Sequence, residues 1–215
     1  IKAEHQLKIA QLDALQKQVT PHFIFNVINS ISRLLSLKEY DTAEQMLTSF
    51  AQMLRYTLSN MKMSVLLEEE LEYIQNYLTI QKMRFGDCID YQIECDKEIQ
   101  SLKIPFFCIQ PLIENSIKHG LLSNQKGGTV SLRCKKHGDC VTITVEDTGS
   151  GIAQDQLQFI RSTLLSPEPT QNEHVGLQNC YRRFLLMFEE NFHFSIESTV
   201  NCSTTVTITL SHPMP

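Results

Sequence analysis

The stretch that decides the fold reads Arg84-Phe85-Gly86-Asp87-Cys88-Ile89-Asp90-Tyr91-Gln92-Ile93-Glu94-Cys95. Before it, apolar residues recur every three or four positions, which is the period of an amphipathic helix. After Gly86, residues 89–95 alternate between apolar and polar side chains, which is the period of a strand. Glycine is also a common helix stop. We therefore place a domain boundary here, with a helical region at residues 1–86 and a sheet-bearing domain at residues 87–215.

Working back from Gly86, three helical segments are expected. One starts at Glu68, and another covers residues 42–59. The third segment lies nearest the N-terminus and carries an apolar face that is expected to pack on residues 42–59 and form a helical hairpin. This face includes Phe23, Val27, Ile28, Ile31, Leu34 and Leu35. Further upstream lies a seam with helical spacing, whose register continues to His22, Asn26 and Asn29: Leu12, Leu15 and Val19. This seam fits a single amphipathic helix or a dimer contact equally well.

Thr20-Pro21 interrupts the seam just before His22, because proline inside a helix lacks a donor and clashes with the preceding turn. Proline is well tolerated at a first helical position, so the chain either kinks or starts a new helix here. If Thr20 caps a new helix, the positive end of the helix dipole favours a neutral His22. A neutral imidazole is the form that a nucleophile needs.

Working forward from Gly86, strands and helices alternate. Strands are expected at residues 89–95, 129–135, 140–146, 192–197 and 204–210. Helices are expected between them at residues 106–119, 154–164 and 177–188. The predicted fold class is therefore α+β, an N-terminal helical hairpin followed by a two-layer α/β domain.

Composition excludes several classes of protein. The 215 residues carry 42% apolar side chains and a formal charge of −5, which is typical of a globular protein and argues against nucleic acid or an anionic membrane as a partner. No apolar run is long enough to span a membrane. The chain begins inside a predicted helix, so we expect the cytoplasmic portion of a longer, membrane-anchored protein whose sensor or membrane segment lies upstream.

Seven cysteines without a Cys-x-x-Cys pair favour free thiols. The spacing of Cys134, His137 and Cys140 resembles a zinc site. Strand alternation argues against it, because Cys134 shares a face with apolar neighbours and Cys140 with polar ones.

Two segments carry residues suited to a metal-bound triphosphate. At the polar end of an apolar helix, Asn115 shares one face with Lys118 and His119. An amide oxygen can hold Mg²⁺, and the two cationic side chains can donate to phosphate. About thirty residues later, a strand ends in Asp147-Thr-Gly149-Ser-Gly151, where a carboxylate can accept from an exocyclic amine. Gly176-Leu177 then opens another helix.

These motifs, in this order, resemble sensor histidine kinases of the LytS/YesM type, whose catalytic half belongs to the GHKL (Bergerat-fold) ATP-binding superfamily. The matching stretches cover most of the chain: Thr20-Pro-His-Phe-Ile-Phe-Asn26, Leu54-Arg-Tyr56, Glu69-Glu-Leu-Glu-Tyr-Ile74, Gln81-Lys-Met-Arg-Phe-Gly86 and Gln110-Pro-Leu-Ile-Glu-Asn-Ser-Ile-Lys-His-Gly120. The resemblance implies a homodimer through the N-terminal helices, ATP and Mg²⁺ as cofactors, and a response regulator as the partner that receives the phosphoryl group on an aspartate.

The resemblance also implies the roles of individual residues. His22 is the phosphoacceptor, Asn115 holds Mg²⁺ and Asp147 binds the adenine amine. Lys118, His119 and Leu177 belong to the same nucleotide site, and three glycines shape its pocket and lid: Gly149, Gly151 and Gly176. In many histidine kinases an acid follows the acceptor, but Phe23 stands here. We therefore assign Asn26 a supporting role at His22 and take Glu114 as the candidate base.

Some residues depart from the family pattern. The lid segment 172–177 keeps one glycine of the usual three, and Ser203 replaces a usual glycine. Both changes stiffen the backbone. An alternative function is therefore a catalytically weak module that dimerises and binds or dephosphorylates a response regulator. An ATPase that uses water is disfavoured, since Pro111 stands where such enzymes carry a water-activating glutamate.

Overall fold

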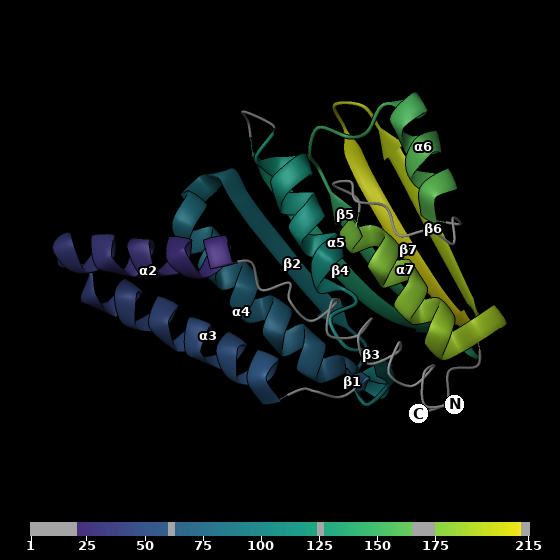
Figure 1. Cartoon of the computed structure of the whole chain (residues 1–215), viewed down its shortest axis with the longest axis horizontal. Helices are drawn as coiled ribbons and strands as arrows, with labels where there is room; N and C mark the ends of the chain where they lie inside the picture. The colour runs from purple at the N-terminus through teal and green to yellow at the C-terminus, as the bar shows by residue number, and fades with distance from the viewer. Residues whose placement is uncertain (1–20, 60–62, 124–126, 165–174, 212–215) are drawn as a thin grey trace, which may run out of the picture.

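The computed structural model describes residues 21–59, 63–123, 127–164 and 175–211. Helices α2 (Pro21–Ser36) and α3 (Tyr40–Ser59) form the predicted hairpin, which lies beside the rest of the molecule (Figure 1). Val27 of α2 is buried, whereas Ile28 and Leu35 remain about half exposed, so the predicted packing of this face on α3 holds only in part. The seam at Leu12, Leu15 and Val19 and the cap at Thr20 lie outside the described residues.

Helix α4 (Leu67–Phe85) connects the hairpin to the sheet. The backbone N–H of Leu66 donates to Glu69 at 2.9 Å and closes the first turn. Gly86, with φ of +58°, ends the helix as predicted. Residues on several sides of α4 are buried, including Tyr73, Ile74, Tyr77 and Leu78. The helix is covered on more than one side because it lies between α3 and the sheet.

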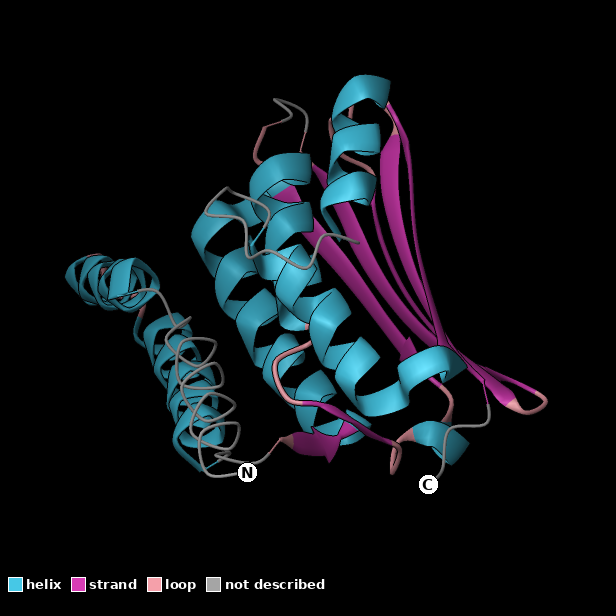
Figure 2. Cartoon of the chain, turned by 45° about the vertical axis from the view of Figure 1, so that its right-hand side comes forward, coloured by secondary structure: helices cyan, strands magenta, loops and turns pink. Residues whose placement is uncertain are grey.

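Five strands form one sheet in the order β2-β4-β5-β7-β6. Their bounds are Ile89–Cys95 for β2, Gly128–His137 for β4, Cys140–Asp147 for β5, Phe192–Thr199 for β6 and Ser203–Ser211 for β7. Only the β2–β4 pair is parallel within this sheet. All five predicted strands are confirmed, and the helices cover one face of the sheet (Figure 2).

The covering helices of the second half are α5 (Gln110–Asn115), α6 (Gln154–Leu164) and α7 (Val175–Phe188). The helix predicted at residues 106–119 starts late, at Gln110, because Phe107 has a φ of +56° that no helix admits. Its last part, Ser116–Leu121, is a π-helical turn. The α+β fold class with a two-layer second half is confirmed.

A second, two-stranded sheet escaped prediction. Strand β1 (Ser64–Leu66) pairs antiparallel with β3 (Lys103–Pro105), across the expected boundary at residue 86. Both strands have three residues, too few for an alternation to stand out in the sequence. The division into residues 1–86 and 87–215 stays a prediction.

Candidate functional site

A cavity of about 250 Å³ opens between the helices and the end of β5. Its apolar walls include Leu112, Ile152, Ile160, Leu177 and Val206. Its polar lining includes Asn115, Ser116, His119, Asp147 and Thr204. Such a cavity, mostly apolar with a few converging polar groups, is the usual form of a small-molecule site.

Asp147 is the buried carboxylate of this cavity, with 3% of its surface exposed. It ends β5, where its backbone is paired with Val130 on β4 and Thr204 on β7. Its Oδ1 accepts from the backbone N–H of Gly149 at 3.0 Å. Burial raises the pKa of Asp147, while hydrogen bonds from Gly149 and the Ser116 side chain act in the opposite direction.

Glycines around Asp147 allow three segments to meet at van der Waals distance. A Cβ at Gly120 would lie 2.5 Å from Asp147 Oδ1, and a Cβ at Gly149 would lie 2.3 Å from the backbone carbon of Gly120. Gly151 has a φ of +63°, and its Cβ would lie 2.1 Å from the carbonyl oxygen of Thr199. Only glycine fits such contacts, so these residues fix the floor of the cavity.

The π-helical turn places the polar residues at the end of α5. Leu122 N donates to the carbonyl of Ile117 five residues earlier at 2.9 Å. The loop after β5 holds the turn in place, since Ser150 Oγ donates to the carbonyl of His119 at 2.8 Å and Ser150 N to that of Gly120 at 3.2 Å. Single π-helical turns inside α-helices occur often at functional sites.

The cavity unites some of the sequence-predicted residues and leaves others outside its lining. Asn115, His119, Asp147, Gly151 and Leu177 line it. Outside the lining are Lys118, which is exposed, Gly149, which packs on Gly120, and Gly176, which packs on Pro111. The lid residues at 172–174 lie outside the described residues.

Sequence reasoning missed Ser116, Gly120, Ser150 and Thr204. Gly120 stood in the recognised motif, but nothing local shows that its missing Cβ makes room for a carboxylate 27 positions away. Ser116 adjoins Asn115 on the same helix and could have been inferred from that position.

His22 is exposed on the first turn of α2. The Nδ2 atom of Asn26 lies 3.1 Å from Nδ1 of His22 and 3.4 Å from its Nε2. The next residue, Phe23, turns inward, and its ring lies 5.5 Å from that of Tyr77 on α4. The amide of Asn26 is thus the polar group that α2 itself holds against the imidazole.

Glu114 faces α4 rather than the cavity. It accepts from Gln110 Nε2 at 2.5 Å, and its charge contributes to raising the pKa values of both Tyr73 and Tyr77 after the larger effect of their burial. Burial raises the pKa of Glu114 itself. Since Tyr77 also contacts Phe23, Glu114 lies on the side of α5 turned toward the helix that carries His22.

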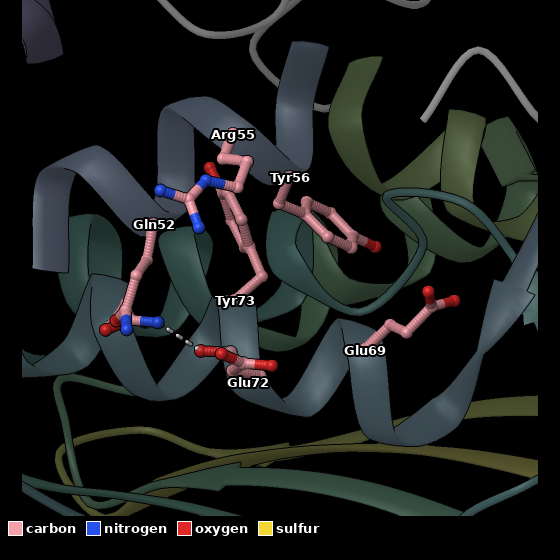
Figure 3. A pocket seen from close by; sticks show the side chains of 7 residues that line it. Gln52, Arg55, Tyr56, Glu69, Glu72 and Tyr73 are labelled. Carbon is pink, nitrogen blue, oxygen red and sulfur yellow. Dashed lines mark hydrogen bonds between the residues drawn. The ribbon is translucent and has the colours of Figure 1, made fainter. Parts of the chain in front are cut away.

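A second pocket, of about 230 Å³, lies between α3 and α4. Figure 3 shows Gln52 and Arg55 of α3 opposite Glu72 of α4, with Tyr56 and Tyr73 beside them. Its polar lining contains no residue of the predicted nucleotide site.

No group of three or more His, Cys, Asp or Glu side chains placed to hold a metal occurs in the part of the chain that the structure describes. Within the same residues, none of the helices has the length and apolar composition of a membrane span.

Comparison with known proteins agrees with this arrangement. Residues 104–214 match the family of histidine kinase-, DNA gyrase B-, and HSP90-like ATPases, and residues 10–89 match the histidine kinase family. The sensor protein kinase HptS of Staphylococcus aureus strain bovine RF122 / ET3-1 is 32% identical over 203 residues, which are 94% of this chain and 38% of that protein. HptS of strain USA300 matches with the same identity and coverage. The chain thus spans well under half the length of these relatives.

Two solved structures share the fold. The histidine kinase domain of the blue-light activated histidine kinase from Erythrobacter litoralis EL346 has a TM-score of 0.51 and 17% identity, covering 94% of each chain. A bacterial phosphotransferase has a TM-score of 0.54 and 16% identity, covering 93% of this chain and 96% of that one. With the match over residues 104–214 covering more than half of its length, this chain belongs to the family of histidine kinase-, DNA gyrase B-, and HSP90-like ATPases and, within it, to the histidine kinases.

Proposed function

We propose that this chain is the kinase part of a two-component sensor, which phosphorylates His22 with ATP and passes the phosphoryl group to an aspartate of a response regulator. One observation carries the proposal. Asp147 is buried at the floor of an apolar cavity that Asn115 and His119 also line, in a chain of an ATPase family.

The cavity suits the adenine end of the nucleotide. Its apolar walls, Leu112, Ile160 and Val206 among them, can hold a flat base. The carboxylate of Asp147 would accept from the exocyclic amine, and that donor would favour the charged form which burial disfavours. Gly120 and Gly149 would act through Asp147, because their missing side chains let it reach this position.

The triphosphate would extend toward the exposed end of the π-helical turn. There His119 lines the cavity and Lys118 is exposed, and both can donate to phosphate oxygens. The side-chain oxygen of Asn115 is the donor type that Mg²⁺ accepts, so this residue would hold the metal. When bound, Mg²⁺ neutralises charge on the phosphates. Gly151 and Leu177 would border the nucleotide, and Gly176 would allow α7 to start close to Pro111.

His22 would be the nucleophile. An exposed imidazole on a helix outside the cavity can be reached by a nucleotide held in the catalytic domain. A hydrogen bond from the Asn26 amide to Nδ1 requires a lone pair on that nitrogen, hence a neutral ring. In the opposite orientation the amide oxygen would accept from Nδ1–H, and in a neutral ring the lone pair then lies on Nε2. Only this second orientation leaves a nitrogen lone pair free, so in it Asn26 would orient the ring for in-line attack through Nε2.

Glu114 would take the proton that the imidazole releases. A carboxylate whose pKa is raised by burial is a stronger base at neutral pH than an exposed one. Its position on the side of α5 that faces α4 turns it toward α2.

The chain would act as a homodimer through the N-terminal helices. On the hairpin, seven large hydrophobic side chains are exposed: Phe25, Ile28, Leu35, Leu37, Tyr40, Leu47 and Leu58. An apolar surface of this kind on a helical hairpin is typical of an association surface. Because the relatives are much longer, we also propose that a sensor and a membrane anchor belong to the same protein upstream of this chain.

Incubation with γ-labelled Mg-ATP tests the proposal. Wild type should acquire acid-labile, alkali-stable label, and His22→Gln should acquire none while it keeps its affinity for ATP. Asn26→Ala should label more slowly at unchanged ATP affinity. Failure to label, with intact ATP binding, dimer and regulator binding, would instead support the catalytically weak regulatory module. Label that persists in His22→Gln would place the acceptor elsewhere.

A further inference from the structure

Cys95 and Cys134 are register partners on β2 and β4, the only parallel pair of the five-stranded sheet. Partners on neighbouring strands lie about 4.8 Å apart and direct their side chains to the same face. A disulfide needs Cα atoms roughly 4.4–6.8 Å apart, so this pair lies within reach of a bond. The hydroxyl of Tyr91, four residues before Cys95, accepts from Gln75 Nε2 at 2.9 Å and lies 3.2 Å from Thr79 Oγ1, so this face of the strand is the one beneath α4.

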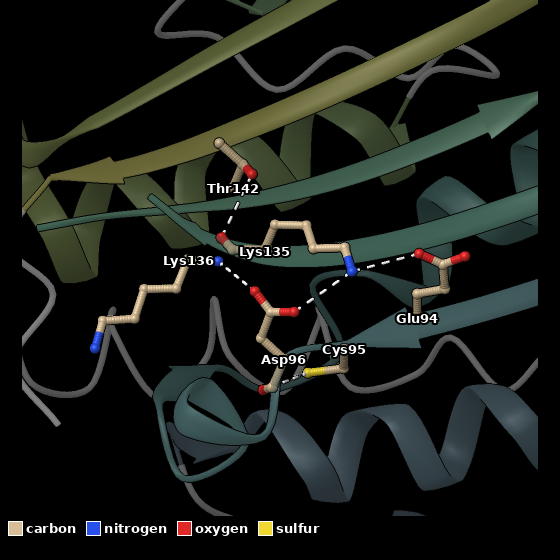
Figure 4. Close-up of polar contacts among 6 residues, drawn as sticks. All are labelled: Glu94, Cys95, Asp96, Lys135, Lys136 and Thr142. Carbon is tan, nitrogen blue, oxygen red and sulfur yellow. Dashed lines mark hydrogen bonds and ion pairs between the residues drawn. The ribbon is translucent and has the colours of Figure 1, made fainter. Parts of the chain in front are cut away.

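The ends of both strands are held in place around this pair. The backbone N–H of Asp96 donates to the carbonyl of Cys134 at 3.0 Å, and the Asp96 carboxylate accepts from Lys136 N at 2.9 Å. Lys135 lies 3.4 Å from both Glu94 and Asp96 (Figure 4). Since polar contacts on both sides fix the register, the two thiols cannot easily slide apart.

The two thiols differ in a way that suits stepwise chemistry. Cys95 is half-buried at the strand end, and its Sγ lies 3.4 Å from the carbonyl of Asp96, whereas Cys134 is fully buried. A hydrogen bond between the side chains lowers the pKa of Cys95 and raises that of Cys134. Burial and the Asp96 carboxylate oppose the lowering of the pKa at Cys95, and Lys135 adds to it. A partly exposed thiol with a lowered pKa beside a second thiol is the arrangement found in redox-sensitive pairs.

We propose that Cys95 and Cys134 form a reversible disulfide when the protein meets hydrogen peroxide. The thiolate of Cys95 attacks one oxygen of the peroxide, the O–O bond breaks, and Cys95 becomes a sulfenic acid as hydroxide leaves. The sulfur of Cys134 then attacks the Cys95 sulfur, and its proton leaves with the sulfenic hydroxyl as water. Each cysteine sulfur loses one electron and the peroxide gains two. A dithiol reverses the reaction.

The disulfide would cross-link edge strand β2 to β4 at a distance from the nucleotide cavity. Asp147 is paired with Val130, and Cys134 lies four residues farther along β4, roughly 13 Å away. Oxidation should therefore raise the thermal unfolding midpoint and leave ATP affinity unchanged.

Peptide mapping tests the proposal on the full chain. The protein is treated with equimolar hydrogen peroxide, alkylated, and digested before aspartate and after lysine and arginine. This cleavage separates Cys95, in residues 90–95, from Cys88, and isolates Cys134 in residues 134–135 away from Cys108. The expected product is these two peptides joined, with the loss of two hydrogen atoms, restored to free thiols by dithiothreitol. Without peroxide, Cys95 should react with iodoacetamide roughly ten-fold faster than Cys134.

Variants make the outcome decisive. Cys95→Ser and Cys134→Ala should abolish the joined peptide and the rise in unfolding midpoint, whereas Cys88→Ser, an exposed cysteine of the same segment, should change neither. If Cys134→Ala unfolds, Cys95→Ser alone carries the comparison. Peroxide treatment that leaves both thiols alkylatable, joins Cys88 or Cys202 between molecules instead, or drives Cys95 to sulfinic acid without the bond would overturn the proposal.

Discussion

Glu70 on α4 and Asp147 at the end of β5 are both buried carboxylates whose pKa values are raised by burial, yet they have different surroundings. Glu70 is fully buried and accepts from Tyr56 Oη at 2.6 Å, Phe107 N at 3.1 Å and Ile109 N at 3.1 Å. The donors come from α3 and from the loop before α5. Glu70 therefore ties the hairpin, α4 and that loop together.

Asp147, by contrast, accepts from the backbone N–H of Gly149 and from the Ser116 side chain, and it borders the cavity. A buried carboxylate that the protein surrounds with its own donors maintains structure, whereas one that borders a cavity can bind a ligand. Strength of burial alone does not separate the two roles. The roles differ because protein donors surround the Glu70 carboxylate, whereas the Asp147 carboxylate has a side that borders the cavity.

The largest effect is expected at Glu70. Glu70→Ala leaves the N–H groups of Phe107 and Ile109 and the Tyr56 hydroxyl without their acceptor, which should lower the free energy of unfolding by about 3 kcal/mol. Urea denaturation measures it. Glu72→Ala, at an exposed glutamate on the same helix, should cost less than about 0.5 kcal/mol. Equal losses in the two variants would contradict the structural role of Glu70.

Asp147→Asn should leave stability nearly unchanged and weaken ATP binding roughly 100-fold, because a charged acceptor is replaced by an amide of the same shape. Isothermal titration with Mg-ATP gives the affinity. The matched control is Glu146→Gln, since Glu146 is the preceding strand residue and binds Arg133 at 2.8 Å on the other face. Should Asp147→Asn bind as tightly as wild type, the cavity does not hold the adenine amine.

Gly120→Ala tests the same carboxylate without altering it. The new Cβ would lie 2.5 Å from Asp147 Oδ1, so the carboxylate must move, and ATP affinity should fall roughly ten-fold. Gly138→Ala is the contrasting variant. Its Cβ meets nothing within 4 Å, and its φ of +60° should cost stability but not affinity. Similar ATP affinities in the two variants would show that the position of Asp147 is not critical.

Sequence reasoning succeeded where structure depends on neighbours along the chain. Helix α6 begins and ends at the predicted residues, 154 and 164, and strand β2 at 89 and 95, because each carries its own apolar periodicity. It failed where distant segments decide the geometry. The β1–β3 pair joins residues that are far apart in the sequence. Phe107 adopts a positive φ in a loop whose backbone N–H groups donate hydrogen bonds to Glu70.

The candidate site divides in the same way. Asn115, Asp147 and His22 could be named from motifs, because each stands in a stretch with recognisable neighbours. The contribution of Gly120 could not, since it depends on contacts with Asp147 and Gly149 that form only in the fold. Nor could the position of Glu114 on the α4 side of its helix, which depends on the packing of Tyr73 and Tyr77 against it.

The smallest expected effect concerns the charge of Glu70 and is a change in the slope of unfolding free energy against pH. Its pKa is raised in the folded state above the unfolded value, so its contribution to stability is full below about pH 4.5 and is lost as pH rises through the folded pKa. Glu70→Gln removes this titration. As pH rises from 4.5 toward 8, the unfolding free energy of Glu70→Gln should therefore increase relative to that of wild type.

The slope is the informative quantity, because the glutamine amide would face the N–H of either Ile109 or Phe107 and lose a hydrogen bond at every pH. Such a loss lowers the unfolding free energy by the same amount at every pH and leaves its slope against pH unchanged. Urea titrations of wild type, Glu70→Gln and the exposed control Glu72→Gln across this range separate the two effects. Parallel curves for wild type and Glu70→Gln would mean that Glu70 is held charged by its three donors despite its burial, and the comparison with Asp147 would then depend on the position of the donors alone.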